Sequence, residues 1–557
     1  MKKRILCALL ALLLLCSCFV ACNDTGDAPT GNTPGAGNGG SSTTIDESTT
    51  ENYLPSELFA KVKTAFEKKD VSNFPALTYD NAPFSIADDA FAGKKIAAIT
   101  IPVQKTGEAD DQGMLQFTLY VMPNTYDAMV SAKSSEVTAH VVKIDPAAYG
   151  IEAGKKVVSK YITVDLTAYN LQLTESQTLA IGAKTDTVML AALDTSATNS
   201  ATASAIFDWR EDWLVIGYYL NLFTGKTGKD NGGLYFTRDS LPIDFVFDYG
   251  TADAKKAVVD ARKAEEDAYA EKLAAVAEAY DGKYLSLIGD SISSFTGVTN
   301  DTSRNEALYN NRCYYGKSFM NDYTQMYWGR LADECNMELC VINGWSSSRV
   351  YGGGSGAPGI DEANKSKLDN MLTRSTTLHT NDGQKPDLII LYMGINDISH
   401  TATWSDLYDR LAARGSKTAT EIVEEWLVGV HNVYNANRDE IIPGTTYKSW
   451  EASYALSLER MKFNYPDAEI YIMNLTRTHN ESRKEELLHK ANTCLAALAE
   501  YYGVNIIDQA KSEITYENCH LYGADEANPT ALHPNLMGHA LMTKLIVETL
   551  YENLPKG

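Results

Sequence analysis

Ser291 stands at the end of a short apolar run, in the sequence SLIGDSISSFTG at positions 286–297. The run predicts a strand, and the residues after it predict that Ser291 opens a helix. A serine there would be exposed at a sheet edge, beside backbone amides that could stabilise an oxyanion on a carbonyl attacked by Ser291. The alternative is that Asp290 or Ser291 only caps the helix, because both residue types are preferred caps.

Three further blocks carry residues that suit the same chemistry. VINGWSSS places Gly344 after a second strand, where a glycine lets the backbone N–H approach a ligand closely. LYMGINDIS places Asn396 after a third strand, with a side-chain amide that can donate to an oxyanion. ALHPNLMGHALMTKLI places His533 in a loop before a terminal helix, and a neutral imidazole is the usual base for activating a serine. Taken alone, Gly344 and Asn396 also fit ordinary turn chemistry.

These four blocks, in this order, resemble the SGNH hydrolase superfamily, also called the GDSL esterases and lipases. The resemblance implies a flavodoxin-like, three-layer α/β domain with a parallel sheet. It implies an esterase with Ser291 as nucleophile and His533 as base. It also implies an oxyanion hole formed by the N–H groups of Ser291 and Gly344 and the side chain of Asn396. No cofactor is expected, and no CxxC or HExxH pattern predicts a metal site.

The chain departs from the family pattern before the histidine. The family usually has an aspartate three residues upstream, where this chain has Thr530. That third group orients the imidazole and stabilises the imidazolium. Asp525, Glu526 and Thr530 are the candidates for this role, and a backbone carbonyl, giving a Ser-His dyad, is the alternative. The departure also leaves open a degenerate, non-catalytic copy. Trp345 and Arg349, in NGWSSSR, are candidate substrate contacts beside the oxyanion block.

The N-terminus predicts export. Residues 1–22, MKKRILCALLALLLLCSCFVAC, place three basic residues before an apolar run, as in a signal peptide. A transmembrane anchor is the alternative, but the run is only marginally long enough to span a bilayer. Its end, FVAC, resembles the lipobox of bacterial lipoproteins, which implies lipidation of Cys22; LCSC, ending at Cys18, is the alternative. We therefore expect an extracytoplasmic protein, lipid-anchored to the bacterial membrane surface.

The rest of the chain divides by composition. Residues 23–52 have almost no apolar side chains and predict a flexible tether rich in Gly, Ser and Thr. Residues 53–250 contain β-rich runs separated by turn residues, which predict an all-β sandwich and a candidate carbohydrate-binding domain. Residues 251–281, rich in Ala, Glu and Lys, predict a connecting helix. Residues 282–557 alternate apolar strands with helices, which predicts a parallel sheet wrapped by helices and carries the SGNH resemblance.

The net charge and the cysteine content argue against two further features, nucleic-acid binding and a disulfide framework. The formal net charge of −23 argues against binding to nucleic acid, where Lys and Arg must neutralise phosphates. Beyond Cys22, a sparse, odd set of cysteines predicts small buried thiols rather than a disulfide framework.

The combined features look similar to bacterial carbohydrate esterases, which join an SGNH-like domain to a β-domain. This implies a serine esterase acting on small acyl esters, with O-acetyl groups on carbohydrate as the expected substrate. The alternatives are a glycan-binding surface protein with a degenerate hydrolase domain, and an O-acyltransferase that uses the same Ser-His pair.

Overall fold

The computed structural model describes the following residues: 45–52, 93–104, 115–123, 138–144, 146–149, 159–184, 189–190, 213–216, 244–298, 313–315, 322–352, 370–400, 404–436, 449–478, 481–516, 519–522, 532–534 and 536–555. The chain divides into two compact units, Met1–Glu265 with Ala524–Pro529, and Glu266–Gly523 with Thr530–Gly557. The long helix α4 (Ala252–Tyr280) contributes residues to both.

The second unit is built on a five-stranded parallel sheet. Its strands are β11 (Tyr284–Gly289), β12 (Glu338–Gly344), β13 (Leu388–Tyr392), β14 (Glu469–Met473) and β15 (Asn505–Ile507). They are ordered β12-β11-β13-β14-β15 and every neighbouring pair is parallel. This is the 2-1-3-4-5 order of flavodoxin-like folds, so the predicted fold class is confirmed for this unit.

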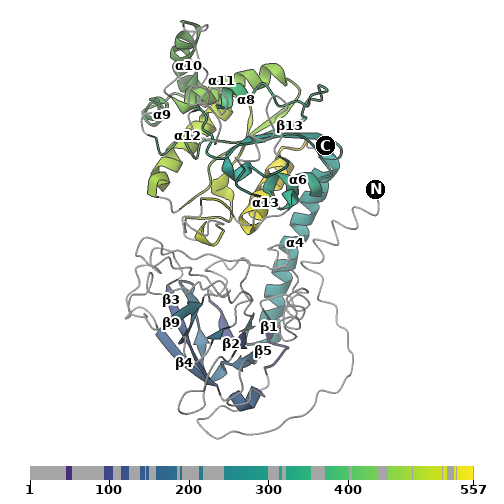
Figure 1. Ribbon diagram of the computed structural model, residues 1–557, viewed down its shortest axis with the longest axis vertical. Helices are drawn as coiled ribbons and strands as arrows, with labels where there is room; N and C mark the ends of the chain where they lie inside the picture. The colour runs from purple at the N-terminus through teal and green to yellow at the C-terminus, as the bar shows by residue number, and fades with distance from the viewer. Residues whose placement is uncertain are drawn as a thin grey trace. The chain divides into compact units, whose positions relative to one another are not determined.

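Helices cover both faces of this sheet, which explains why its strands are apolar on both sides. The central strand β13, LIILY, is buried at every position. Figure 1 shows α6 and α13 on one side of β13, with α8, α10 and α11 on the other. Among the described residues of this unit, the helices beyond α4 are α6 (Tyr327–Glu334), α8 (Met371–Arg374), α9 (Leu407–Ala412), α10 (Ala419–Ala436), α11 (Trp450–Asn464), α12 (Glu485–Tyr502) and α13 (Leu536–Asn553).

The first unit contains two antiparallel sheets. One has the order β1-β10-β2-β5, with β6 and β8 also paired to β2, and the other has the order β4-β3-β7-β9. The strands are β1 (Thr50–Asn52), β2 (Lys95–Gln104), β3 (Leu115–Pro123), β4 (Thr138–Ile144), β5 (Ser159–Asp165), β6 (Leu171–Gln172), β7 (Gln177–Lys184), β8 (Met189–Leu190), β9 (Trp213–Ile216) and β10 (Asp244–Asp248). The all-β prediction is confirmed for these strands, while sandwich packing of the two sheets stays a prediction.

Two boundaries differ from the sequence-based expectation. The predicted tether, 23–52, ends in a strand, because β1 pairs with β10 through Thr50–Asp248, Glu51–Phe247 and Asn52–Val246. The predicted connecting helix, 251–281, agrees with α4 to within a residue at each end, but the unit boundary falls inside it, between Glu265 and Glu266. Neither feature has an apolar pattern that would have revealed it.

Two other expectations concern single residues or short segments. Five cysteines, Cys313, Cys335, Cys340, Cys494 and Cys519, are buried free thiols, as predicted. Cys22 and the whole signal segment, 1–22, lie outside the described residues. Among the residues that the structure does describe, no helix has both the length and the apolar character needed to cross a bilayer.

Glu51 is the polar anchor that holds β1 in place. Its side chain is 6% exposed, and its Oε1 lies 2.6 Å from Nη2 of Arg262 on α4. Its Oε2 accepts a hydrogen bond of 3.0 Å from the hydroxyl of Tyr249. Burying a carboxylate is unfavourable unless such partners replace water, so this pair explains how a polar segment can end in a buried strand.

We therefore expect Glu51→Ala to lower the free energy of unfolding by about 1–3 kcal/mol, because it leaves a part-buried hydroxyl and a guanidinium without their acceptor. Urea unfolding followed by circular dichroism measures this. Lys256→Ala is the matched control, because it breaks an ion pair with Asp260 whose side chains are 72% and 61% exposed. Equal effects of the two substitutions would contradict an anchoring role for Glu51.

Candidate active site

Ser291 and His533, far apart in sequence, meet at the carboxyl edge of the parallel sheet. Ser291 follows β11 by two residues, and His533 lies just before α13. The His533 Nε2 atom lies 2.9 Å from the Ser291 Oγ atom, within hydrogen-bond distance. Both residues are buried, at 6% and 9% exposure. The contact lets the imidazole take a proton from the hydroxyl, the geometry that activates a serine.

The turn that carries Ser291 is shorter than the sequence predicts. Ser291 opens the single 3₁₀ turn η9 (Ser291–Ser293) and not an α-helix. Asp290 is the cap, since its Oδ1 accepts a 3.0 Å hydrogen bond from the Ile292 N–H. One short turn aligns few peptide dipoles, so the expected contribution of a helix dipole to an oxyanion is small here. The capping role falls to Asp290 and leaves the Ser291 hydroxyl to His533.

Gly344 ends β12 and packs tightly against the turn after Ser291. A Cβ atom on Gly344 would come within 2.6 Å of the Ser293 carbonyl oxygen and 2.9 Å of the Ser294 Cα. The register pairs Gly344 with Gly289, and Trp345 N–H donates to the Gly289 carbonyl at 3.1 Å. Only glycine allows this approach, and the packing holds the Gly344 backbone beside the Ser291 turn.

Asn396 lies in the loop after β13, where Gly394 adopts a φ of +124° that side chains rarely allow. Its Nδ2 donates to the Ser348 carbonyl at 3.1 Å, and its Oδ1 accepts from Arg483 Nη2 at 3.2 Å. Arg483 also donates from Nε to the Ile395 carbonyl at 2.8 Å. Because the guanidinium takes the amide oxygen, the amide is held with its nitrogen turned the other way. The second N–H of Nδ2 then remains to donate to a ligand.

A segment that the sequence did not single out supports His533. The ring of Tyr314 stacks on the imidazole, with ring centroids 3.7 Å apart and an interplanar angle of 11°. Tyr315 donates from its hydroxyl to the Pro534 carbonyl at 2.8 Å. Tyr314 N–H donates to Ser294 Oγ at 2.9 Å, and Ser294 Oγ donates to the Ser291 carbonyl at 3.0 Å. The same short segment therefore positions both members of the Ser-His pair.

Arg374, at the end of α8, is fully buried and joins the ends of β11 and β12. Its Nε donates to Asn343 Oδ1 at 3.0 Å and its Nη1 to Ser348 Oγ at 3.0 Å. Its Nη2 donates to the carbonyls of Gly289 and Asn343. Sequence reasoning missed this residue, because nothing near it in the sequence indicates that its partners lie on two strands that are far from it in the sequence.

The remaining predicted site residues have different outcomes. Trp345 is only 2% exposed, so its side chain is part of the interior beside the site. Arg349 is half-buried and donates from Nη1 to the Tyr351 hydroxyl at 3.2 Å. The three candidates for orienting the histidine, Asp525, Glu526 and Thr530, lie outside the described residues, and their role stays a prediction.

Comparison with known protein families identifies a domain in this chain. Residues 287–541 match the model of the GDSL-like lipase/acylhydrolase family. This part of the chain belongs to that family. The predicted superfamily is thereby confirmed for the GDSL-like domain, and the chain contains an ester-hydrolase domain. No curated protein was found to match the sequence.

Several solved structures are similar to this chain at low identity. A Bacteroides ovatus protein described as a GDSL-like lipase is 19% identical over 49% of this chain and 100% of its own, with a TM-score of 0.31. A carbohydrate acetylesterase from Sinorhizobium meliloti is 13% identical over 48% of this chain and 99% of its own, with a TM-score of 0.26. An active-site mutant of a family two carbohydrate esterase from Clostridium thermocellum is 11% identical over 83% of this chain and 90% of its own, with a TM-score of 0.27. Similarities of this size carry no argument about substrate.

Two buried carboxyl groups lie close to the site of the GDSL-like domain. Burial raises the pKa of Asp290 to about 7, although the charges of Arg374 and Arg483 oppose the shift. Burial likewise raises the pKa of Asp397 to about 8, against hydrogen bonds from the Val350 N–H at 3.1 and 3.0 Å. Both groups therefore lose part of their negative charge near neutral pH, whereas the guanidinium groups keep theirs.

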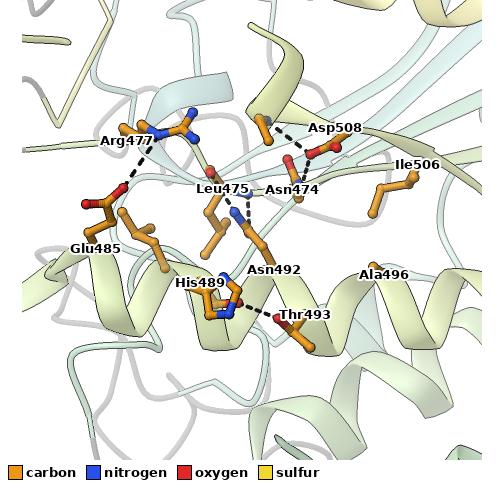
Figure 2. A pocket seen from close by; sticks show the side chains of 12 residues that line it. Asn474, Leu475, Arg477, Glu485, His489, Asn492, Thr493, Ala496, Ile506 and Asp508 are labelled. Atoms are coloured by element: carbon orange, nitrogen blue, oxygen red, sulfur yellow. Dashed lines mark hydrogen bonds and ion pairs between the residues drawn. The ribbon is translucent and has the colours of Figure 1, made fainter. Parts of the chain in front are cut away.

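A separate hollow of about 320 Å³ lies at the carboxyl ends of β14 and β15, and neither Ser291 nor His533 lines it. Figure 2 shows its polar side chains bonded to one another and to the backbone. Asn474 donates to Asp508 at 2.9 Å, and Asn492 bonds both backbone groups of Leu475, at 2.8 and 3.1 Å. These contacts tie α12 to the strand ends, so the hollow is best explained as part of the scaffold.

The stack on His533 predicts a change in rate. Replacing Tyr314 with Leu removes an aromatic face that would stabilise the imidazolium, so kcat for a simple ester should fall about three- to tenfold. Tyr314→Phe keeps the ring and should retain kcat, and steady-state kinetics compares the two. A Leu variant with the parent's kcat would show that the stack does not support the histidine.

Asp397 predicts a pH dependence of stability. Its folded pKa, about 8, lies above the ordinary aspartate pKa of 3.8, so between these values the folded state holds a proton that the unfolded state has released. The free energy of unfolding should therefore fall as pH rises from about 4 to about 8. Asp397→Asn keeps an acceptor for Val350 and should flatten this slope by up to about 1.4 kcal/mol per pH unit.

Urea unfolding at pH 5 to 9 measures the slope. Asp406→Asn, which removes a carboxylate with a 57% exposed side chain on the surface, serves as the control. A slope unaltered by Asp397→Asn would mean that Asp397 is ionised throughout this range.

Proposed function

We propose that the protein is a serine esterase that hydrolyses small acyl esters, with Ser291 as nucleophile and His533 as general base. The observation that carries this proposal is the 2.9 Å contact between His533 Nε2 and Ser291 Oγ at the carboxyl edge of the sheet. A hydrogen bond of this length between a buried imidazole and a buried hydroxyl supports an intact Ser-His pair rather than a degenerate copy.

In the proposed mechanism His533 Nε2 accepts the Ser291 proton as Oγ attacks the ester carbonyl carbon. The carbonyl oxygen becomes an oxyanion, to which the Ser291 and Gly344 N–H groups and the free N–H of Asn396 Nδ2 donate. The imidazolium then gives its proton to the departing alcohol, leaving an acyl-serine. Water, deprotonated by His533, attacks the acyl group and releases the acid, and the proton returns to Ser291.

We propose O-acetyl groups on carbohydrate as the substrate. The low exposure of Ser291 and His533, with the Tyr314 ring stacked on the imidazole, favours a small acyl group over a long chain. The N-terminal sequence, which resembles a signal peptide and a lipobox, and the β-rich first unit support an extracellular glycan as the alcohol half. The proposal includes lipid anchoring at Cys22, on the outer side of a bacterial membrane, and carbohydrate binding by the β-rich unit.

Hydrolysis of 4-nitrophenyl acetate by residues 45–557 tests the chemistry. Ser291→Ala and His533→Ala should each lower kcat/KM by about 10³-fold or more, because either change removes the activated nucleophile. The double variant should lose no more than either single one, since the two residues act as a unit.

Each outcome bears on a different alternative. An inactive parent, inactive also on acetylated glycans, would favour a binding protein with a degenerate hydrolase domain. Acetyl transfer to added sugar faster than hydrolysis would favour an O-acyltransferase. Variants as active as the parent would show that Ser291 and His533 are not the catalytic pair.

A further inference from the structure

Two guanidinium groups flank the Asn396 side of the site. Arg483 donates to Asn396 Oδ1 at 3.2 Å, and Asn396 Nδ2 donates at 3.1 Å to the carbonyl of Ser348, the residue before Arg349. Arg349 and Arg483 are both half-buried. They come from the loop after β12 and from the turn η12 (Glu481–Arg483), two segments that meet only through the fold.

Neither guanidinium has a carboxylate partner in the part of the chain that the structure describes. Arg349 bonds the Tyr351 hydroxyl, and its buried Nε has no hydrogen-bond partner there. Arg483 bonds two carbonyl-type oxygens, of Ile395 and Asn396, and the Ser482 hydroxyl. Other cations of this acidic chain do have carboxylate partners at 2.6 to 2.9 Å, among them Arg262, Lys272, Arg410 and Lys417.

The charges of Arg349 and Arg483 are near enough to shift the pKa of common neighbours. Burial lowers the pKa of the Arg483 guanidinium; the charge of Asp290 opposes this shift, and the charge of Arg349 adds to it. Burial also lowers the pKa of His400, and both guanidinium charges act on it in the same direction. Asp397 does not cancel these charges at neutral pH, because burial raises its pKa to about 8.

We propose that Arg349 and Arg483 bind an anionic group, a carboxylate on the alcohol half of the ester substrate. A guanidinium presents paired N–H donors that match the oxygens of a carboxylate or a phosphate, which is the shared chemistry of such ligands. The alcohol half is the place for this group, since the buried Ser-His pair favours a small, uncharged acyl group. On a glycan, this describes an acetylated sugar acid. The inference rests on the proposed esterase function.

A matched pair of acetate esters tests it. The esters 4-acetoxybenzoate and methyl 4-acetoxybenzoate differ in the alcohol half, which carries a carboxylate in the first and its neutral methyl ester in the second, and each releases a phenol that absorbs in the ultraviolet. The readout is the ratio of kcat/KM for the anionic ester to that for the neutral ester. Because the intrinsic reactivities of the two esters are the same for every variant, changes in this ratio report recognition of the charge.

Arg349→Gln should lower this ratio about tenfold, the loss expected for one hydrogen-bonded charge pair. Arg349→Lys keeps the charge and should recover part of the ratio. Arg483 is not the variant of choice, because it also holds Asn396 and would affect both esters. Lys417→Gln is the control, because it removes one positive charge just before α10, far from the site. Nearby Thr420 donates a hydrogen bond to Glu500, which lies at the end of α12 opposite to Arg483. Lys417→Gln should leave the ratio unaltered.

The outcomes separate the inference from the proposed function. If both esters are cleaved and Arg349→Gln leaves the ratio unchanged, the inference is overturned and the esterase proposal stands. If 4-acetoxyphenyl phosphate shows the stronger dependence on Arg349, the anion is a phosphate and the carboxylate assignment is wrong. If neither ester is cleaved, the esterase proposal fails. Calorimetry then measures the binding of 4-hydroxybenzoate and of its methyl ester to the parent and to Arg349→Gln. The anion site exists if the parent prefers 4-hydroxybenzoate and Arg349→Gln loses that preference.

Discussion

The buried guanidinium of Arg374 is the interaction on which the rest of the site depends. It donates to groups on the ends of two adjacent strands, β11 and β12, and to Ser348 in the loop that follows β12. A buried charge is tolerated only when hydrogen bonds replace its water, and these contacts supply such hydrogen bonds to the guanidinium. Because Gly289 lies two residues before Ser291, and Asn343 directly before Gly344, one side chain sets the spacing of the nucleophile and an oxyanion donor.

A series of short-range contacts connects the ends of β11 and β12 to His533. Gly344 lies against the backbone of Ser293 and Ser294, so the turn after the nucleophile cannot move away from β12 without opening a gap. The Ser294 hydroxyl links that turn to Tyr314, whose ring stacks on His533. The base is thus located relative to the nucleophile by packing and hydrogen bonds over a few residues, which is how an active site keeps a fixed geometry on a loop.

The sequence predicted the parts of the molecule that local patterns encode. Strands β11 to β15 follow from apolar runs such as DLIILYM, and the Ser291, Gly344, Asn396 and His533 blocks from their order after those runs. The structure brings Ser291 and His533 together, as the resemblance implied. The polar strand β1 and the short turn η9 could not be predicted, since Glu51 bonds partners about two hundred residues away and the turn packs against Gly344 of another strand.

Arg374 and Arg483 were missed for the same physical reason. An arginine in an exposed helix and an arginine that bonds distant carbonyls are identical in local sequence, and only the fold distinguishes them. Tyr314 likewise stands in CYYG, which has no periodicity that points to an active site. Residues that position a catalytic group act through long-range contacts, so they are harder to predict than the catalytic group itself, whose chemistry restricts its residue type.

The charge of the site opposes the charge of the chain. The protein carries a formal net charge of −23, yet burial suppresses the charge of Asp290 and Asp397 near neutral pH while Arg349, Arg374 and Arg483 remain cationic. At physiological salt, the electric fields of exposed carboxylates are screened over about 8 Å. Cations within the protein act on near neighbours through a lower dielectric constant, which makes their interactions stronger. These charges favour a positive local potential near Asn396. Such a potential favours an oxyanion forming at the carbonyl and a negative group on the substrate alike, so one set of buried charges can serve both the reaction and the selection of its substrate.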